Sequence, residues 1–252
     1  PIPAMSACHT LYAWPEKRLG QIQTGTTTMA TQVVLRQINS KIWLAISAII
    51  VAAAALTAEP AAATRGNINL TAFGDSLTAG YGLPPGADFA SRLEAALARR
   101  GHQVRVTNAG VSGDTTSGGL ARFDWAVPED ADAVILELGA NDALRGIDPK
   151  IAEANLDKIL AKLAARNIPA LIAGMRAPAN WGADYQKIFD AMYAKLAKKY
   201  QVQLYPFFLE GVIDKPALKL PDALHPNMAG VEEIVRRILP SVEKLIARVK
   251  AR

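Results

Sequence analysis

Apolar and polar positions follow two alternating patterns along the chain from residue 64 onward. Short apolar runs have the length and composition of strands that are buried on both faces of a parallel sheet. These runs span residues 68–73, 104–106, 133–138, 170–173 and 202–205. Longer segments repeat apolar residues at helical spacing, and they span residues 89–100, 151–166, 185–200 and 228–249.

This alternation of strand and helix predicts the arrangement of the sheet. It favours a parallel sheet with helices on both faces, connected by right-handed crossovers. Five strands are too few for an eight-fold barrel, so we predict one α/β domain with a doubly wound sheet over residues 64–252. Ligands of such open sheets bind at the carboxyl ends of the strands, and the search for chemistry therefore starts there.

Before this domain, residues 42–58 form an uncharged run of 17 mostly apolar residues. Arg36 and Lys41 precede the run, and Pro60 and three alanines follow it. A basic start, an apolar centre and small residues at the end are typical of a secretory signal. The pattern predicts an exported protein, periplasmic or secreted.

We place the signal peptide over residues 29–63, with cleavage after Ala63. Cleavage after Ala58 is one alternative, and an uncleaved anchor is another because the apolar run is at the lower limit for a membrane-spanning helix. Met29 is the more natural start of such a signal, so residues 1–28 are excluded from the fold as an upstream artefact.

Charge and cysteine content exclude two classes of site. The chain carries a net charge of +5, and residues 64–252 hold 24 basic and 21 acidic side chains. This small excess does not indicate a nucleic-acid partner. Cys8 is the only cysteine and precedes the predicted cleavage site, so we expect neither disulfides nor thiolate metal sites in the mature chain.

A serine lies where the first predicted strand ends, in the sequence Gly74-Asp75-Ser76-Leu77. Its hydroxyl group would face the cleft at the carboxyl edge of the sheet, although a serine at such a turn can also simply cap a helix. As a nucleophile it needs a base within hydrogen-bond reach.

The mature chain offers only two histidines as that base, His102 and His225. His102 precedes the second strand, at the opposite edge of the sheet, and we interpret it as a surface residue. His225 follows the fifth strand, and Asp222 is close enough in sequence to fix its tautomer. A local capping pair is the alternative for Asp222 and His225; together with Ser76 we predict a catalytic triad.

Two further strand ends offer donors for an oxyanion. Gly113 has an unobstructed backbone N–H group, and Asn141 has a side-chain amide. Taken alone, both are ordinary turn residues. Asp75 and Asp114 adjoin these positions, and we assign them a role in bracing the loops.

Four segments together resemble the sequence blocks of the SGNH, or GDSL, hydrolases. They are Gly-Asp-Ser-Leu at 74–77, Gly113, Gly-Ala-Asn-Asp at 139–142 and Asp-x-x-His at 222–225. Loop residues 144–146 and 176–182 resemble those of the bacterial thioesterase I, arylesterase and lysophospholipase group.

This resemblance implies a flavodoxin-like three-layer α/β/α sandwich. It also implies an oxyanion hole made by the N–H groups of Ser76 and Gly113 and the amide of Asn141. The expected activity is hydrolysis of carboxylic esters, thioesters or lysolipids through an acyl-serine intermediate, without metal or organic cofactor. No stable membrane span is expected after the signal is removed.

Three loop residues are candidate substrate contacts. Pro178 and Trp181 follow the fourth strand and are placed to fold over the cleft, whereas Arg145 is placed to meet a headgroup. A packed tryptophan and a surface ion pair are the alternative interpretations of Trp181 and Arg145.

Two other functions compete with the esterase. The same triad would serve a carbohydrate O-deacetylase, which the low aromatic content of 6% disfavours. A nucleotide- or phosphate-binding protein is suggested by the glycines of residues 110–119. That loop lacks Gly-Lys-[Ser/Thr] and does not match Gly-x-Gly-x-x-Gly.

Overall fold

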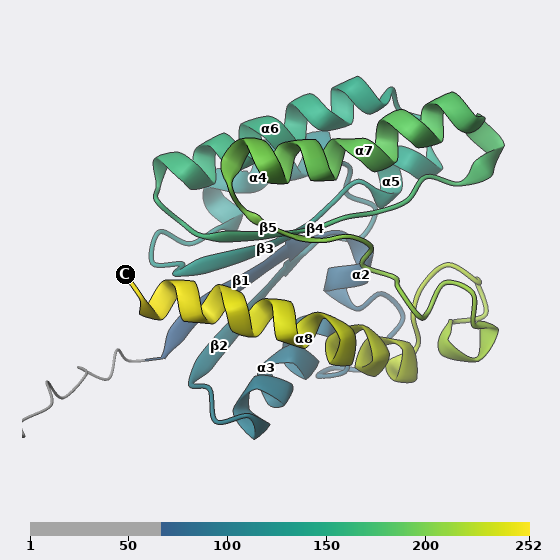
Figure 1. Ribbon diagram of the computed structural model, residues 1–252. Coiled ribbons are helices and arrows are strands. Elements are labelled where there is room, and N and C mark those ends of the chain that lie inside the picture. Colours follow the sequence, from purple (N-terminus) through teal and green to yellow (C-terminus); the bar gives the residue numbers. More distant parts are fainter. Residues whose placement is uncertain (1–66) are drawn as a thin grey trace, which may run out of the picture. The chain divides into compact units, whose positions relative to one another are not determined.

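A single sheet of five parallel strands organises residues 67–252, the part of the chain that the computed structural model describes (Figure 1). The strand order is β2-β1-β3-β4-β5, which is the flavodoxin-like order. The strands are β1 (Ile68–Gly74), β2 (Val104–Gly110), β3 (Ala133–Glu137), β4 (Ala170–Ala173) and β5 (Gln203–Tyr205). The predicted α/β class and strand number are confirmed.

Helices cover both faces of this sheet, as Figure 1 shows. One face carries α3 (Phe89–Arg99) and α8 (Met228–Lys250), and the other carries α4 (Thr116–Ala126), α6 (Pro149–Ala165) and α7 (Ala183–Tyr200). Because β1, β3 and β4 lie between these layers, their side chains are almost all buried. Within residues 67–252, no helix combines the length and apolar character needed to cross a membrane.

Helix α4 was not predicted from the sequence. Residues 110–119, interpreted there as a glycine-bearing loop, instead contain the end of β2, a turn and the first residues of α4. Thr115 caps the helix by accepting a hydrogen bond from the N–H of Gly118 at 3.3 Å. Gly119 packs so closely on Leu138 that a Cβ atom would overlap that side chain.

Two short helices, also missed, begin directly at strand ends. Helix α2 (Ser76–Ala79) follows β1, and α5 (Ala140–Leu144) follows β3. Two single 3-10 turns, Ala179–Trp181 and Pro216–Leu218, lie in the later loops. The predicted leader, residues 1–63, lies outside the described residues and stays a prediction.

Candidate active site

Ser76 is the first residue of α2, at the carboxyl end of β1. The side chain of Asp75 caps this helix, because its Oδ1 accepts a hydrogen bond from the N–H of Leu77 at 3.0 Å. The turn needs glycine before it: a Cβ atom on Gly74 would lie 2.6 Å from the carbonyl oxygen of Glu137. Ser76 itself keeps 8% of its surface exposed, enough for its hydroxyl group to face a cavity.

The structure brings Ser76, His225 and Asp222 together in one hydrogen-bonded row. Ser76 Oγ lies 2.9 Å from Nε2 of His225, and Nδ1 of the same ring lies 2.7 Å from Asp222 Oδ2. Residues 76 and 225 are 149 positions apart, so the sheet topology is what joins them. This geometry matches that of a nucleophile, base and orienting acid.

Asp222 is held in its ionised form by its own loop. The backbone N–H groups of His225 and Leu224 both donate to its Oδ1, at 3.0 and 2.9 Å. Together with the imidazole of His225, these donors lower the pKa of Asp222 to about 2. The imidazole of His225 also contacts the ring of Tyr81, with 4.5 Å between the two ring centroids.

Two arginines, Arg145 and Arg122, bind residues of the Gly113 turn. Gly113 has a φ of 82°, in the left-handed region that favours glycine. Arg145 donates to its carbonyl oxygen at 2.9 Å, and among residues 67–252 it forms no ion pair. Arg122 pairs with the neighbouring Asp114 at 2.6 Å.

Arg122 also binds the ends of two strands. Its guanidinium donates to the carbonyl oxygens of Gly74 at 2.8 Å and Ala109 at 2.9 Å. A buried cation thereby joins β1, β2 and the Gly113 turn. The sequence interpretation missed this residue because it missed the helix that carries it.

Asn141 and Asp142, at the start of α5, connect the remaining loops. Asn141 Nδ2 donates to Asp75 Oδ2 at 3.1 Å. Asp142 accepts the N–H and the hydroxyl group of Thr116 at 2.8 and 2.7 Å. The bracing role predicted for Asp75 and Asp114 agrees with these contacts.

A cavity of about 500 Å³ opens beside Ser76, His225 and Asn141. Most of its other lining residues are apolar: Leu77, Ala140, Ala143, Leu144, Met175, Ala177, Pro178, Phe207, Leu209, Ile213 and Leu224. Pro178 is therefore at the cavity, whereas Trp181 and Arg145 are not among its lining residues. Trp181 donates from Nε1 to the carbonyl oxygen of Ala143 at 2.7 Å.

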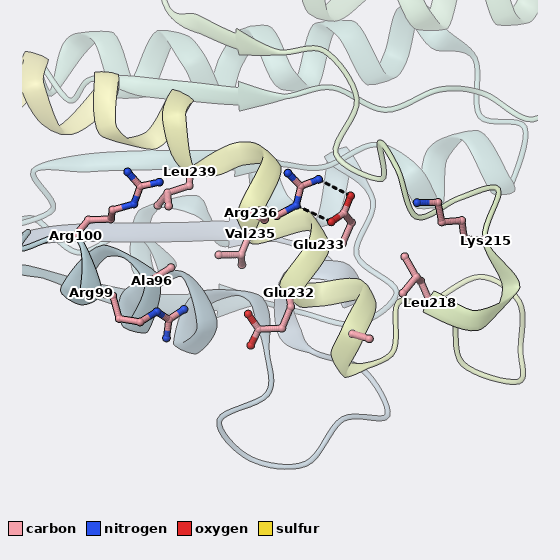
Figure 2. A pocket seen from close by; sticks show the side chains of 11 residues that line it. Ala96, Arg99, Arg100, Lys215, Leu218, Glu232, Glu233, Val235, Arg236 and Leu239 are labelled. Atoms are coloured by element: carbon pink, nitrogen blue, oxygen red, sulfur yellow. Dashed lines mark hydrogen bonds and ion pairs between the residues drawn. The ribbon is translucent and has the colours of Figure 1, made fainter.

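Another surface pocket, of about 530 Å³, lies between α3 and α8 (Figure 2). Charged side chains line much of it, and Glu233 and Arg236 are hydrogen-bonded to each other there. None of the predicted site residues reaches this pocket. His102 also lies away from the site, with Nε2 3.3 Å from Glu243 Oε1.

One more buried residue, Glu137, was missed although the sequence carries a signal for it. It ends the strand Ala-Val-Ile-Leu-Glu, and it is fully buried under the Ser76 turn. A charged residue within an apolar run at a strand's carboxyl end is the pattern that singles it out. Within residues 67–252, no cluster of histidine, cysteine and carboxylate side chains is suited to a metal ion.

Known proteins that resemble this chain in sequence or structure include esterases and acylhydrolases. The GDSL-like Lipase/Acylhydrolase family matches residues 72–232. An arylesterase of Vibrio mimicus is 42% identical over 66% of this chain and 84% of its own length. The "Thioesterase 1/protease 1/lysophospholipase L1" of Escherichia coli K12 is 40% identical over 63% and 75% of the two chains. The crystal structure of AlinE4, "a SGNH-hydrolase family esterase", aligns over 72% of this chain and 98% of its own with 48% identity and a TM-score of 0.62.

Proposed function

We propose a catalytic mechanism for this chain, which belongs to the GDSL-like lipase/acylhydrolase family and hydrolyses ester or thioester bonds of small molecules. In this mechanism Ser76 is the nucleophile, His225 is the general base and Asp222 orients the imidazole. The 2.9 Å separation of Ser76 Oγ and His225 Nε2 is the observation that carries the proposal.

The reaction proceeds in two steps. His225 takes the hydroxyl proton through Nε2 while Ser76 Oγ attacks the carbonyl carbon, and the imidazolium then protonates the leaving alcohol or thiol. Water next attacks the acyl-serine with His225 again as base, which releases the acid and restores Ser76. The ionised Asp222 stabilises the imidazolium in both steps.

The oxyanion that forms in each step is stabilised by the backbone N–H groups of Ser76 and Gly113 and by the amide of Asn141. Neither N–H group has an acceptor among the described residues, so both are available to a substrate. Asn141 uses one amide hydrogen on Asp75, which leaves the other for the oxyanion.

The apolar cavity supports an acyl chain longer than acetyl as the substrate's acid portion. Pro178 is a contact for this chain. Trp181 donates a hydrogen bond to the carbonyl oxygen of Ala143, and Arg145 donates one to the carbonyl oxygen of Gly113. These two side chains therefore reach the substrate only if their loops close over it. The apolar lining gives no support to a carbohydrate O-deacetylase.

Export of the enzyme is part of the proposal. The signal peptide over residues 29–63 would deliver residues 64–252 to the periplasm or the medium. Mass spectrometry of the exported protein tests this: a mature chain that begins at Thr64 supports cleavage after Ala63, and retention of the apolar segment contradicts it.

The catalytic proposal is tested by hydrolysis of p-nitrophenyl esters from acetyl to dodecanoyl. Ser76→Ala should abolish turnover, while Ser91→Ala, on the exposed surface of α3, is the matched control and should not change it. Unchanged activity in Ser76→Ala would contradict the mechanism. An optimum at acetyl would contradict the role of the cavity.

A further inference from the structure

Two carboxyl groups beneath the nucleophile turn are left unused by the mechanism above. Glu137 ends β3, Asp75 lies between β1 and α2, and both side chains are 0% exposed. The backbone N–H of Asp75 donates to Glu137 Oε2 at 3.3 Å, so the two residues are in direct contact. Because two negative charges this close and this deeply buried repel each other, one of the two carboxyl groups carries a proton.

Among the surrounding groups, His225 lowers the pKa of Asp75 electrostatically but is not paired with it. Neither carboxyl group forms an ion pair with a described cation. Arg122, on α4, is nearby, but it binds Asp114 and backbone carbonyl oxygens. Tyr193, on α7, donates to the carbonyl oxygen of Leu138 at 3.0 Å, and Asp142, on α5, is occupied by Thr116.

The donors around each group assign the proton to Glu137. Its Oε2 accepts from Thr78 Oγ1 at 2.9 Å and from the N–H of Asp75 at 3.3 Å, whereas its buried Oε1 receives no hydrogen bond from any described donor. An ionised carboxylate with a bare buried oxygen is unfavourable. Asp75, in contrast, has donors on both oxygens, Leu77 and Asn141.

Electrostatics favour the same assignment. Burial and the charge of Asp75 raise the pKa of Glu137 well above its ordinary value. Burial raises the pKa of Asp75 only to about 6, because the N–H of Leu77 and the amide of Asn141 stabilise its charge.

Asp75 is also the residue that orients the Asn141 amide. The 3.1 Å bond from Asn141 Nδ2 to Asp75 Oδ2 fixes the plane of this amide and thereby the direction of its second N–H bond. A displacement of the Asp75 carboxylate would turn the amide with it.

We propose, on the basis of the function proposed above, that Glu137 is a positioning residue: as a neutral acid it donates to Asp75 and so fixes the Asn141 amide for the oxyanion. Glu137 does not touch the substrate. These contacts join the turn between β1 and α2, which holds Asp75, to the end of β3 and the start of α5, which hold Glu137 and Asn141.

The test is a double-mutant cycle on kcat with p-nitrophenyl butyrate. Glu137→Met keeps the volume but removes the donor, and we expect kcat to fall about tenfold with KM nearly unchanged, because a misaligned donor acts on the transition state. Asn141→Ala should lower kcat about 100-fold. In the double variant, Glu137→Met should add almost nothing to the effect of Asn141→Ala.

Glu137→Gln sharpens the test, since its amide replaces the donated proton. We expect this variant to retain most of the wild-type kcat. A loss as large as that of Glu137→Met would overturn the neutral-acid assignment. Urea unfolding verifies that all variants are folded. If the effects of the two substitutions on kcat are multiplicative in the double variant, Glu137 does not act through Asn141 and is only a structural residue.

The two proposals fail in different ways. An unchanged kcat in Asn141→Ala would refute the proposed oxyanion hole and this inference with it. A large loss in Asn141→Ala with multiplicative effects in the cycle would refute the role of Glu137 alone.

Discussion

The two halves of the site are built in opposite ways. On the oxyanion side, Asp75, Glu137 and Arg122 are buried, and their hydrogen bonds join loops that are distant in sequence. On the acid–base side, Asp222 and His225 lie on one exposed loop and are fixed by bonds across three residues.

This difference follows from what each half must do. In the proposed mechanism the base exchanges protons with substrate and water, so it must lie near solvent, and hydrogen bonds within its own loop are enough to orient it. The oxyanion donors must already point at one place before charge develops there. Rigidity of that kind comes from buried polar bonds whose disruption is costly.

The acid–base side should give the largest effect on turnover. His225→Gln removes the base, and we expect kcat to fall about 10⁴-fold or more while the free energy of unfolding changes little. His102→Gln is the control and should leave kcat unchanged, since the imidazole of His102 lies away from the site, beside Glu243. Comparable losses in both variants would contradict the assignment of the base.

Asp222→Asn should have the next largest effect, about 10³-fold on kcat, because the neutral amide no longer stabilises the imidazolium. With a pKa of about 2, Asp222 is ionised in the folded state throughout the working range. Its contribution to stability is present above its ordinary value of 3.8 and is lost as pH falls towards 2.

Acid unfolding followed by circular dichroism checks this sign. The wild type should lose stability relative to Asp222→Asn between pH 4 and pH 2, the interval between the ordinary and lowered pKa values. Parallel curves in this interval would mean that Asp222 is not the stabilised carboxylate described above.

The oxyanion side should respond in stability as well as in turnover. Arg122→Met leaves Asp114 and two strand-end carbonyl oxygens without their donor, and we expect a loss of about 3 kcal/mol in urea unfolding. Arg145→Met, which removes one exposed bond to Gly113, should cost less than about 1 kcal/mol. Equal losses would remove the distinction between the buried and exposed arginines.

The smallest expected effect is on the pH dependence of the free energy of unfolding, which depends on the proton of Glu137. The pKa of Glu137 is raised in the folded state, so above pH 4.5, its ordinary pKa, unfolding releases the proton of this group. The stability that this proton contributes is therefore full below pH 4.5 and is lost as pH rises towards the pKa of Glu137 in the folded state. Glu137→Gln carries no such proton. Its stability relative to wild type should therefore grow by up to about 1.4 kcal/mol per pH unit above 4.5; a constant difference would contradict the protonated state.

The residues of the proposed triad and oxyanion hole could be selected from the sequence, whereas the buried residues that brace them could not. Asp222 and His225 are three residues apart, and strand ends of a parallel sheet meet at one edge, so Ser76, Gly113 and Asn141 could be gathered by topology alone. Glu137 and Arg122 act on residues 62 and 48 positions away, and only the packed fold pairs them.

Helix α4 was missed for a related reason. It begins with Thr116-Ser117-Gly118-Gly119, which as isolated sequence favours a turn. The cap by Thr115 and the close packing of Gly119 on Leu138 override that preference. Helices α2 and α5 are four and five residues long, too short to show a helical period.

The identity of the nucleophile is tested most directly by a covalent trap. The protein is treated with a p-nitrophenyl alkylphosphonate, and the modified peptide is located by mass spectrometry. We predict one adduct per chain on Ser76, formed in His102→Gln at the wild-type rate and at least about 100-fold more slowly in His225→Gln. An adduct on another residue, or equal rates in the two histidine variants, would contradict the account.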